Sequence, residues 1–193
     1  RKESSAASDV YKRQLLLVAL GAVSLVRSAS QRAALNDITE MRIPITKSMG
    51  ALADGVNVQA IQFRNLAIFN NESITKSSRE RVAAARIAIA EQIKTLTTLI
   101  QSEKGKEILA RVQQHRAAFL KLGDEYMALI QQGQRDEALK LLEEKLRPVQ
   151  LEYQKAIQEQ VEYQAQVTVA AGQKAEAEAN ALQRDVLLSL IHI

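Results

Sequence analysis

The sequence contains no cysteine and no tryptophan, only two prolines and seven glycines, and aromatic residues make up just 4% of its 193 positions. The absence of cysteine excludes disulfides, thiolate metal sites and cysteine catalysis. The residues that dominate instead are alanine, leucine, glutamine, glutamate and lysine, all of which favour helices. This composition predicts an all-α domain with an aliphatic core.

Motifs for catalysis and for nucleic-acid binding are also missing. The net charge is +4, and basic and acidic residues alternate along the chain instead of clustering, which gives no support for nucleic-acid binding. There is no glycine-rich phosphate loop, no HExxH motif and no nucleophile elbow. His115 has no second histidine or acidic pair at ligand spacing, so we expect a core or edge residue. We expect no enzyme activity, no catalytic residue, no metal site and no cofactor.

Both ends of the sequence carry apolar segments. Residues 15–26 are uncharged and apolar apart from Ser24, and no acidic residue follows until Asp37. Because a spanning helix needs about 20 apolar residues, we interpret 14–27 as a truncated first transmembrane segment behind a non-native tail, 1–13. Residues 185–193 are interpreted as the start of a truncated second segment or another such tail, which leaves 28–184 for the folded domain. The alternatives for 15–26 are a signal-peptide core or an apolar helix end of a soluble protein.

Four helical stretches are predicted between short polar breaks, at about 15–69, up to about 100, 106–132 and 137 onward. Ser77 or Ser78 is expected to cap the second stretch, and Asp136 the fourth. Gly105 is expected in the turn between the second and third. Pro44 and Pro148 fall inside the first and fourth stretches, where proline removes a backbone donor and can kink a helix.

Apolar positions in each stretch recur at alternating steps of three and four residues, which is the spacing of a heptad stripe. The predicted seams are Ile45, Met49, Leu52, Val56, Gln59, Phe63 and Leu66; Val82, Arg86, Ile89, Ile93, Leu96 and Ile100; Ile108, Val112, His115, Phe119, Leu122, Tyr126 and Leu129; and Leu142, Leu146, Val149, Tyr153, Ala156, Gln160, Tyr163 and Val167. Four such stripes predict an antiparallel up-down-up-down four-helix bundle with long first and fourth helices. Its loops near Asn71 and Gly133 would form the tip far from the membrane.

Arg64 lies off the seam of the first helix. It shares a second, partly apolar face with Asn57, Ile61 and Ile68, since these positions are three or four residues apart. A second apolar face needs a second partner, most simply the same helix of a twin subunit in a homodimer. We expect Arg64 near that interface.

Arg86 is a second unusual position, because it replaces an apolar residue in a seam. A seam arginine either extends out to solvent or meets an anion. Arg81 and Arg79 lie nearer the tip, while Tyr126 and Tyr153 are seam tyrosines whose hydroxyls need partners. Arginine forks bind carboxylates bidentately, so the candidate ligand-binding residues for a small carboxylate are Arg64, Arg86, Tyr126, Arg81 and Tyr153. The alternatives are arginines paired with nearby acids and tyrosines that belong to the core.

The stretches "RNLAIF" at 64–69 and "RDEALKLLEEKLRPVQLEYQKAI" at 135–157, with the apolar N-terminal run and the polar tip, resemble the four-helix-bundle sensor domain of methyl-accepting chemotaxis proteins. The aspartate and serine receptors are members of that family. The resemblance covers roughly residues 25–190, and the same module also precedes some histidine kinases and diguanylate cyclases.

The resemblance implies a membrane-anchored homodimer of the inner membrane with its bundle in the periplasm. It implies an amino acid or small organic acid as ligand, Arg64 as carboxylate anchor, and a small displacement of the fourth helix as signal. In a full-length receptor it implies a chemotaxis histidine kinase and a coupling protein as partners. The aspartate receptors cluster further arginines after the first, whereas residues 68–71 here are Ile, Phe, Asn and Asn, which puts aspartate itself in doubt.

Two other functions compete with a direct sensor of small ligands. One is a structural helical bundle in which Arg64 and Arg86 only set the register of the helices. The other is a receptor that docks a periplasmic binding protein at its tip. A shared cavity for Arg64 and Arg86 would favour the direct sensor, whereas separate acidic partners would favour a structural role.

Overall fold

The structure is a computed structural model that describes the backbone of residues 2–191, while the side chains of residues 1–9, 12, 16, 178, 182 and 185–193 lie outside the described set. The described chain runs as α1, η1, α2, α3, α4, α5, η2 and α6, where η marks a π-helical segment. It divides into two compact units, residues 1–41 with 167–193, and residues 42–166.

The first unit contains α1 (Lys2–Asn36), most of η1 (Asp37–Arg42) and the later part of α6 (Arg147–Ile191). None of its described side chains is buried. Helical residues 13–68 contain an 18-residue window apolar enough to cross a membrane, and none of that window is buried. Its exposure argues against a core helix. The predicted tail over 1–13 and the second segment over 185–193 fall largely on side chains outside the described set, and both remain predictions.

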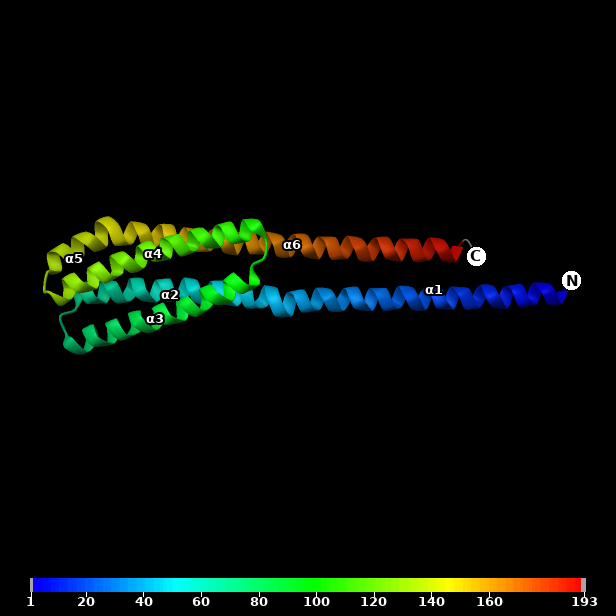
Figure 1. The fold of residues 1–193 in the computed structure, drawn as a ribbon, viewed down its shortest axis with the longest axis horizontal. Helices are drawn as coiled ribbons and strands as arrows, with labels where there is room; N and C mark the ends of the chain where they lie inside the picture. The colour runs from blue at the N-terminus through cyan, green and yellow to red at the C-terminus, as the bar shows by residue number, and fades with distance from the viewer. Residues whose placement is uncertain (1, 192–193) are drawn as a thin grey trace. The chain divides into compact units, whose positions relative to one another are not determined.

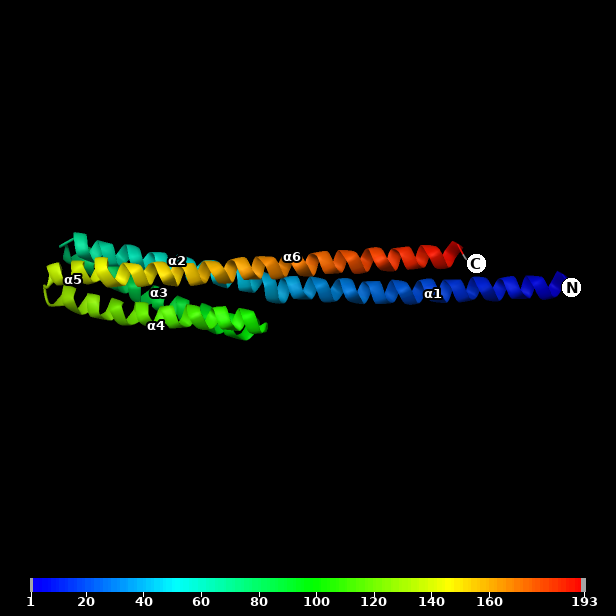
Figure 2. The ribbon, with the colours of Figure 1, turned by 90° about the horizontal axis from the view of Figure 1, so that it is seen from above.

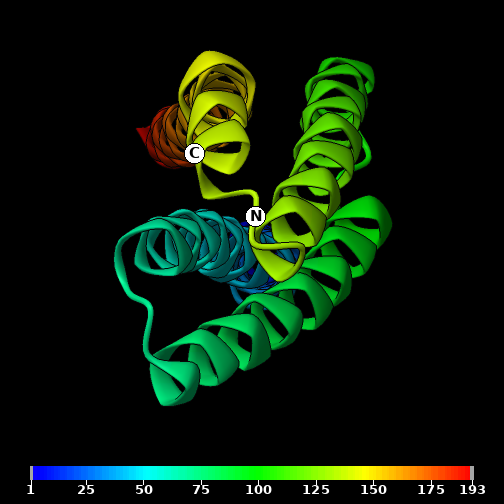
Figure 3. The same ribbon diagram turned by 90° about the vertical axis from the view of Figure 1, so that its left-hand side faces the viewer.

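The second unit is the predicted bundle, and its all-α, up-down-up-down architecture is confirmed. Its limbs are α2 (Ile43–Ile68), α3 (Glu72–Leu99), α4 (Glu103–Gln131), and a fourth limb of α5 (Arg135–Leu141), η2 (Leu142–Leu146) and the first part of α6. Figures 1 and 2 together place α2 beside α3 and beside the start of α6. Figure 3 looks along these limbs from the end that carries the loops after α2 and α4. The two loops therefore share one end of the bundle, as predicted.

The predicted seams form the core of this unit. Every seam residue of α2 is buried, and so is every seam residue of α3 except Arg86. In α4 and α6 each seam residue is buried or half-buried, and Phe119, Tyr126 and Tyr153 are the largest fully buried side chains of these two helices. The α2–α3 pair packs closely, because a Cβ on Gly55 would lie 2.7 Å from Cγ1 of Ile89.

Both prolines follow a π-helical segment. Pro44 comes two residues after η1 and Pro148 two residues after η2. A proline has no N–H to donate, and its ring collides with the carbonyl four residues earlier. Here those carbonyls belong to Glu40 and Glu144, which lie inside the wider π turns. The helices thus accommodate the prolines by widening, and the helical path continues through both.

Two predicted helix caps and one boundary were wrong. Helix α3 begins six or seven residues before the predicted serine caps: Asn71 is its N-cap, and the Asn71 side chain accepts a hydrogen bond from the Ile74 backbone N–H at 3.2 Å. Helix α5 is preceded by Gln134, without a side-chain cap, so Asp136 lies inside the helix. Gly105 is not in a turn but in the first turn of α4, which Ser102 caps by accepting from the Gly105 N–H at 3.3 Å.

Candidate functional site

Arg135 joins the two loops at the tip. Its guanidinium donates to the Phe69 carbonyl at 2.8 Å and to the Ala67 carbonyl at 3.5 Å. These carbonyls end α2, where four backbone acceptors lack helical partners. The start of the fourth limb is thereby attached to the end of the first. Sequence inspection missed this contact, since nothing in the sequence links Arg135 to a backbone carbonyl 66 positions away.

Arg64 lies on the exposed face of α2, as predicted. Its side chain makes no hydrogen bond or ion pair with any residue that the structure describes. Ile61 and Ile68 on the same face are 50% and 69% exposed. Asn57, one heptad before Arg64, accepts a hydrogen bond at 2.6 Å from Gln154 of α6. This face, defined by Asn57, Ile61, Arg64 and Ile68, therefore runs along the α2–α6 side of the bundle.

Arg86 has an acidic partner. Its Nη1 pairs with Asp124 Oδ1 on α4 at 2.5 Å. Its Nη2 lies beside Gly123, where a Cβ would come within 3.0 Å of it, and the Phe63 ring lies against the same point. Arg86 thus packs beside Phe63 and Gly123, whereas the Arg64 side chain is exposed. The pair with Asp124 favours the structural alternative for Arg86, while its Nε and Nη2 have no partner among the described residues, so ligand contact by Arg86 stays a prediction.

Tyr126 is a core residue. It is fully buried, its hydroxyl donates to the Phe63 carbonyl at 2.6 Å, and its ring packs edge-on against Phe63 with centroids 5.4 Å apart. Burial raises the pKa of Tyr126 to about 12, while the positive charge of Arg135 acts in the opposite direction. Because the carbonyl occupies its hydroxyl, Tyr126 has no donor left for a ligand.

Tyr153 is equally buried, and its ring lies 6.0 Å from that of Phe119. Burial raises the pKa of the Tyr153 hydroxyl, and the positive charge of Arg116 acts against that rise. Among the described residues, no side chain or backbone group hydrogen-bonds to this hydroxyl. The Tyr153 side chain points into the bundle interior and not onto the Arg64 face.

Arg81 and Arg79 lie nearer the tip on α3. Arg81 is exposed and makes no hydrogen bond or ion pair with any residue that the structure describes. Arg79 is half-buried, and its Nε is buried without a partner among those residues. Of the five candidate ligand-binding residues, Arg64 and Arg81 are therefore the two whose charged groups are accessible and unpaired within the described chain.

A groove of about 650 Å³ lies between α4 and the η2–α6 junction, and sequence inspection did not find it. It is lined by His115 and Ala118 of α4 and by Glu143, Arg147, Pro148, Val149, Leu151 and Glu152 of the fourth limb. His115 is half-buried at its edge, in keeping with the expected role. No group of three or more potential metal ligands occurs among the described residues.

The sequence matches the model of a protein family described as a four helix bundle sensory module for signal transduction, over residues 14–179. The chain belongs to this family. The search of curated proteins found no match to the sequence. The match starts at the apolar N-terminal run, so this sensory module comprises the whole bundle unit and part of the first unit. The resemblance to the sensor domain of chemotaxis receptors is confirmed at the level of the family.

The face of α2 around Arg64 combines charge with exposed apolar surface. Arg64 stands there between Ile61 and Ile68, and an exposed guanidinium next to apolar side chains is suited to a small molecule with a carboxylate and a nonpolar part. The family membership makes the chain a signal-transduction domain.

Proposed function

We propose that this chain is the extracytoplasmic ligand-sensing module of a bacterial chemoreceptor, anchored in the inner membrane with its bundle in the periplasm. Its ligand is a small carboxylate, an organic acid or an amino acid, bound at the α2 face around Arg64. The observation that supports this proposal is an exposed arginine that no described residue pairs, set between exposed isoleucines. A guanidinium offers two parallel N–H donors to a carboxylate, and such charge-assisted bonds are stronger than neutral ones.

The proposed site is completed by a second copy of the chain. Exposed Ile61 and Ile68 give α2 an apolar face that this protomer leaves uncovered. Packing of two such faces across a two-fold axis would cover the isoleucines and place two Arg64 side chains near the same axis. A ligand between them would be partly shielded from water, which strengthens the ionic contacts.

Signalling then follows from the position of α6 next to this face. The Asn57–Gln154 hydrogen bond links α2 to α6 one heptad away from Arg64. Helix α6 is continuous from Arg147 to Ile191. A ligand that binds one position of α6 more tightly than another shifts the population by that difference in affinity. In a full-length receptor the output would reach a chemotaxis histidine kinase through its coupling protein; sensor domains of histidine kinases or diguanylate cyclases are the alternative.

The test is a thermal-shift screen of the 193-residue chain in detergent against amino acids, dicarboxylates and tricarboxylates. A ligand at 100-fold excess over its Kd stabilises the folded state by about 2.7 kcal/mol. We expect at least one carboxylate to raise the Tm of the wild type, and Arg64→Ala to abolish that rise. Lys140→Ala is the control, since it removes an exposed positive charge that is not among the candidate ligand-binding residues. A carboxylate shift that persists in Arg64→Ala would place the site elsewhere.

A second candidate is recognition of a periplasmic binding protein at the tip. Ile68, Phe69 and Leu139 are 69%, 42% and 45% exposed there, around the contact between Arg135 and the Phe69 carbonyl. Exposed apolar side chains that cluster on a surface are typical of protein-binding sites. If no small molecule shifts the Tm, the binding-protein function becomes the stronger one. Phe69→Ser would then be expected to abolish binding of that protein.

A further inference from the structure

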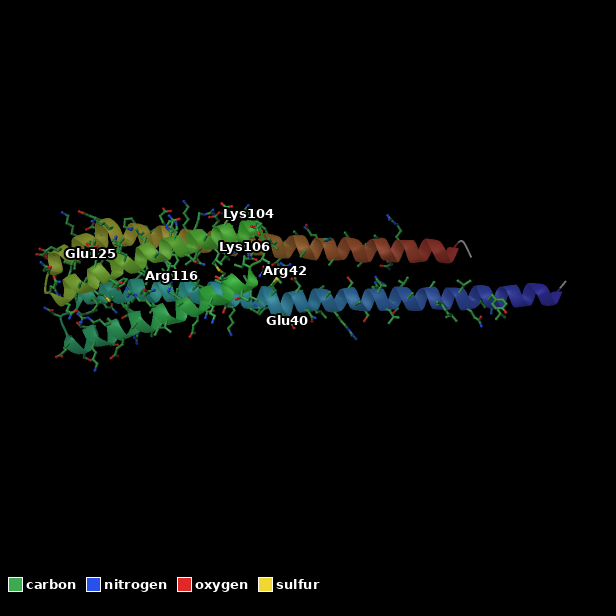
Figure 4. The ribbon with its side chains drawn as sticks, viewed as in Figure 1. Glu40, Arg42, Lys104, Lys106, Arg116 and Glu125 are labelled. Atoms are coloured by element: carbon green, nitrogen blue, oxygen red, sulfur yellow. The ribbon has the colours of Figure 1, made fainter. Side chains whose placement is uncertain are left out.

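Six side chains have buried polar atoms without a partner among the described residues, and three of them, from three different limbs, are near one aromatic cluster. These atoms are Oε1 of Gln59 on α2, Nε of Arg116 on α4 and the hydroxyl of Tyr153 on α6. Gln59 is 1% exposed and Tyr153 is 0% exposed, so neither reaches bulk solvent. Arg116 is half-buried, and its position on α4 is labelled in Figure 4. Buried polar atoms in folded proteins are nearly always hydrogen-bonded, so three such atoms need an explanation.

The three side chains lie at or about one helical turn from an aromatic cluster of Phe63, Phe119 and Tyr153. The Phe119 ring packs against Phe63 of α2 at 5.8 Å and against Tyr153 of α6 at 6.0 Å. Arg116 precedes Phe119 by three residues and Gln59 precedes Phe63 by four. Because α2 and α4 run in the same direction, both lie about one helical turn from the aromatic pair, on the same side of it.

One further contact places Tyr153 at this level. The Asn57–Gln154 hydrogen bond sets α6 against α2, so that Tyr153 and Gln59 each lie next to this bond along their helices. In keeping with this placement, the positive charge of Arg116 acts against the rise that burial causes in the pKa of the Tyr153 hydroxyl. Gln59, Arg116 and Tyr153 are therefore treated together as the polar layer.

The polar atoms of the polar layer could all form hydrogen bonds with one water molecule. Arg116 Nε can only donate, Gln59 Oε1 can only accept, and the Tyr153 hydroxyl can do either. One water molecule could accept from Arg116 and donate to Gln59 and to Tyr153, which makes three hydrogen bonds, the usual number for a buried water. A small anion would suit Arg116 and Tyr153 but would oppose the carbonyl oxygen of Gln59.

We propose that Gln59, Arg116 and Tyr153 form an internal hydration site, in which bound water links α6 to α2 and α4. This site is distinct from the Arg64 face and does not depend on any ligand bound there. The bound water would give α2 and α6 a second link besides the direct Asn57–Gln154 hydrogen bond. A displacement of α6 would then break the hydrogen bonds that hold the water.

The test compares two tyrosine-to-phenylalanine variants of the full chain by thermal unfolding in detergent. Tyr126→Phe is the reference, because its hydroxyl has a direct protein partner, the Phe63 carbonyl, and its loss should lower the Tm by about 2–4 °C. A water-bonded Tyr153 predicts a decrease of similar size in Tyr153→Phe. A hydroxyl that is buried without water predicts the opposite, since its removal would leave the Tm unchanged or higher, and this result would overturn the proposal.

A double-mutant cycle of Tyr153→Phe and Gln59→Met, followed by the change in Tm, tests whether the two side chains share one water molecule. Shared water predicts that the second substitution costs less once the first has been made, because the bridge is already broken. Effects that simply add would overturn the shared site. A Tm rise with acetate or sulfate that is lost in Arg116→Gln would show an anion in place of water, and would also overturn the proposal.

Discussion

Gln160 is a glutamine in an apolar layer of the bundle. It is 0% exposed, and neither its amide nitrogen nor its amide oxygen has a hydrogen-bond partner among the described residues. It lies seven residues after Tyr153, and the positions seven residues before Gln59 and Phe119 are Leu52 and Val112. Seven residues cover the same length on every helix, so Gln160 lies at the level of Leu52 and Val112. Its neighbours at that level are apolar, whereas Tyr153 lies at the level of the polar Gln59.

We predict that Gln160→Leu stabilises the bundle. The substitution keeps a side chain of similar size and removes an amide whose burial without partners costs roughly 1–3 kcal/mol. Denaturant unfolding followed by circular dichroism should show a higher midpoint. Gln158→Leu is the control, because Gln158 is exposed and a surface change of this kind should stay within about 0.5 kcal/mol. A lower midpoint for Gln160→Leu would mean that the amide is satisfied, for example by water.

At the residue scale, the heptad pattern predicted exposure but could not predict partners. It placed Arg64 off the seam correctly, because periodicity alone determines which face of a helix a residue occupies. It could not assign Arg86 to Asp124, which is 38 positions away on another helix. Nor could it find the partner of Tyr126, since that partner is a backbone carbonyl, which every residue has. The role of Arg64 in ligand binding stays a prediction.

The start of α3 depends on one side chain. Asn71 adopts an extended backbone conformation and its side chain accepts from the Ile74 N–H, so it satisfies one of the unpaired donors of the first turn. We expect Asn71→Ala to lower the free energy of unfolding by about 1 kcal/mol. Ser77→Ala, at one of the two cap positions predicted from sequence, should have little effect. A larger loss in Ser77→Ala than in Asn71→Ala, measured by denaturant unfolding, would contradict this helix start.

At the element scale, the existence of each helix was predictable and its ends were not. The two asparagines before Glu72 are as suitable for capping as the serines that follow, and the sequence alone does not rank them. Tertiary packing decides in favour of Asn71, because Ile74 and Thr75 are half-buried and Ser78 is buried, all within the helix. The prolines were correctly expected to disturb their helices. The sequence did not show the form of the disturbance, which is a π-helical segment ending two residues before each proline.

The exposed apolar face of α2 predicts the assembly of the whole molecule. Ile61 is 50% exposed, and in the proposed homodimer it would be buried against the partner. We expect Ile61→Glu to shift the chain from dimer to monomer in sedimentation experiments, because it places charges of the same sign opposite each other across the two-fold axis. Ile87→Glu is the matched control, since Ile87 on α3 is 65% exposed and lies outside the proposed interface. A dimer that survives Ile61→Glu and dissociates with Ile87→Glu would assign the interface to α3.

At the scale of the whole molecule, most of the fold could be predicted from the sequence. Four heptad stripes with short breaks leave few arrangements other than an antiparallel bundle, because each stripe must be buried by its neighbours. The candidate site was less predictable, since a ligand site depends on which polar groups remain unpaired after folding. Arg86 pairs with Asp124, and the Tyr126 hydroxyl donates to the Phe63 carbonyl. Gln59, Arg116 and Tyr153 instead keep buried atoms without a partner among the described residues. Ligand contact by the five candidate residues stays a prediction.

An even number of antiparallel limbs returns the chain to the end from which it started. In the bundle unit this brings Arg42 and Gln166 to the end opposite the Asn71 and Gly133 loops. The chain therefore enters and leaves the unit at the same end. The loops at Asn71 and Gly133 lie at the other end. A chain opened at Gly133, where a positive φ of 76° already marks a tight turn, and closed by a linker from 166 to 42 would keep every limb in its direction and every layer in its place.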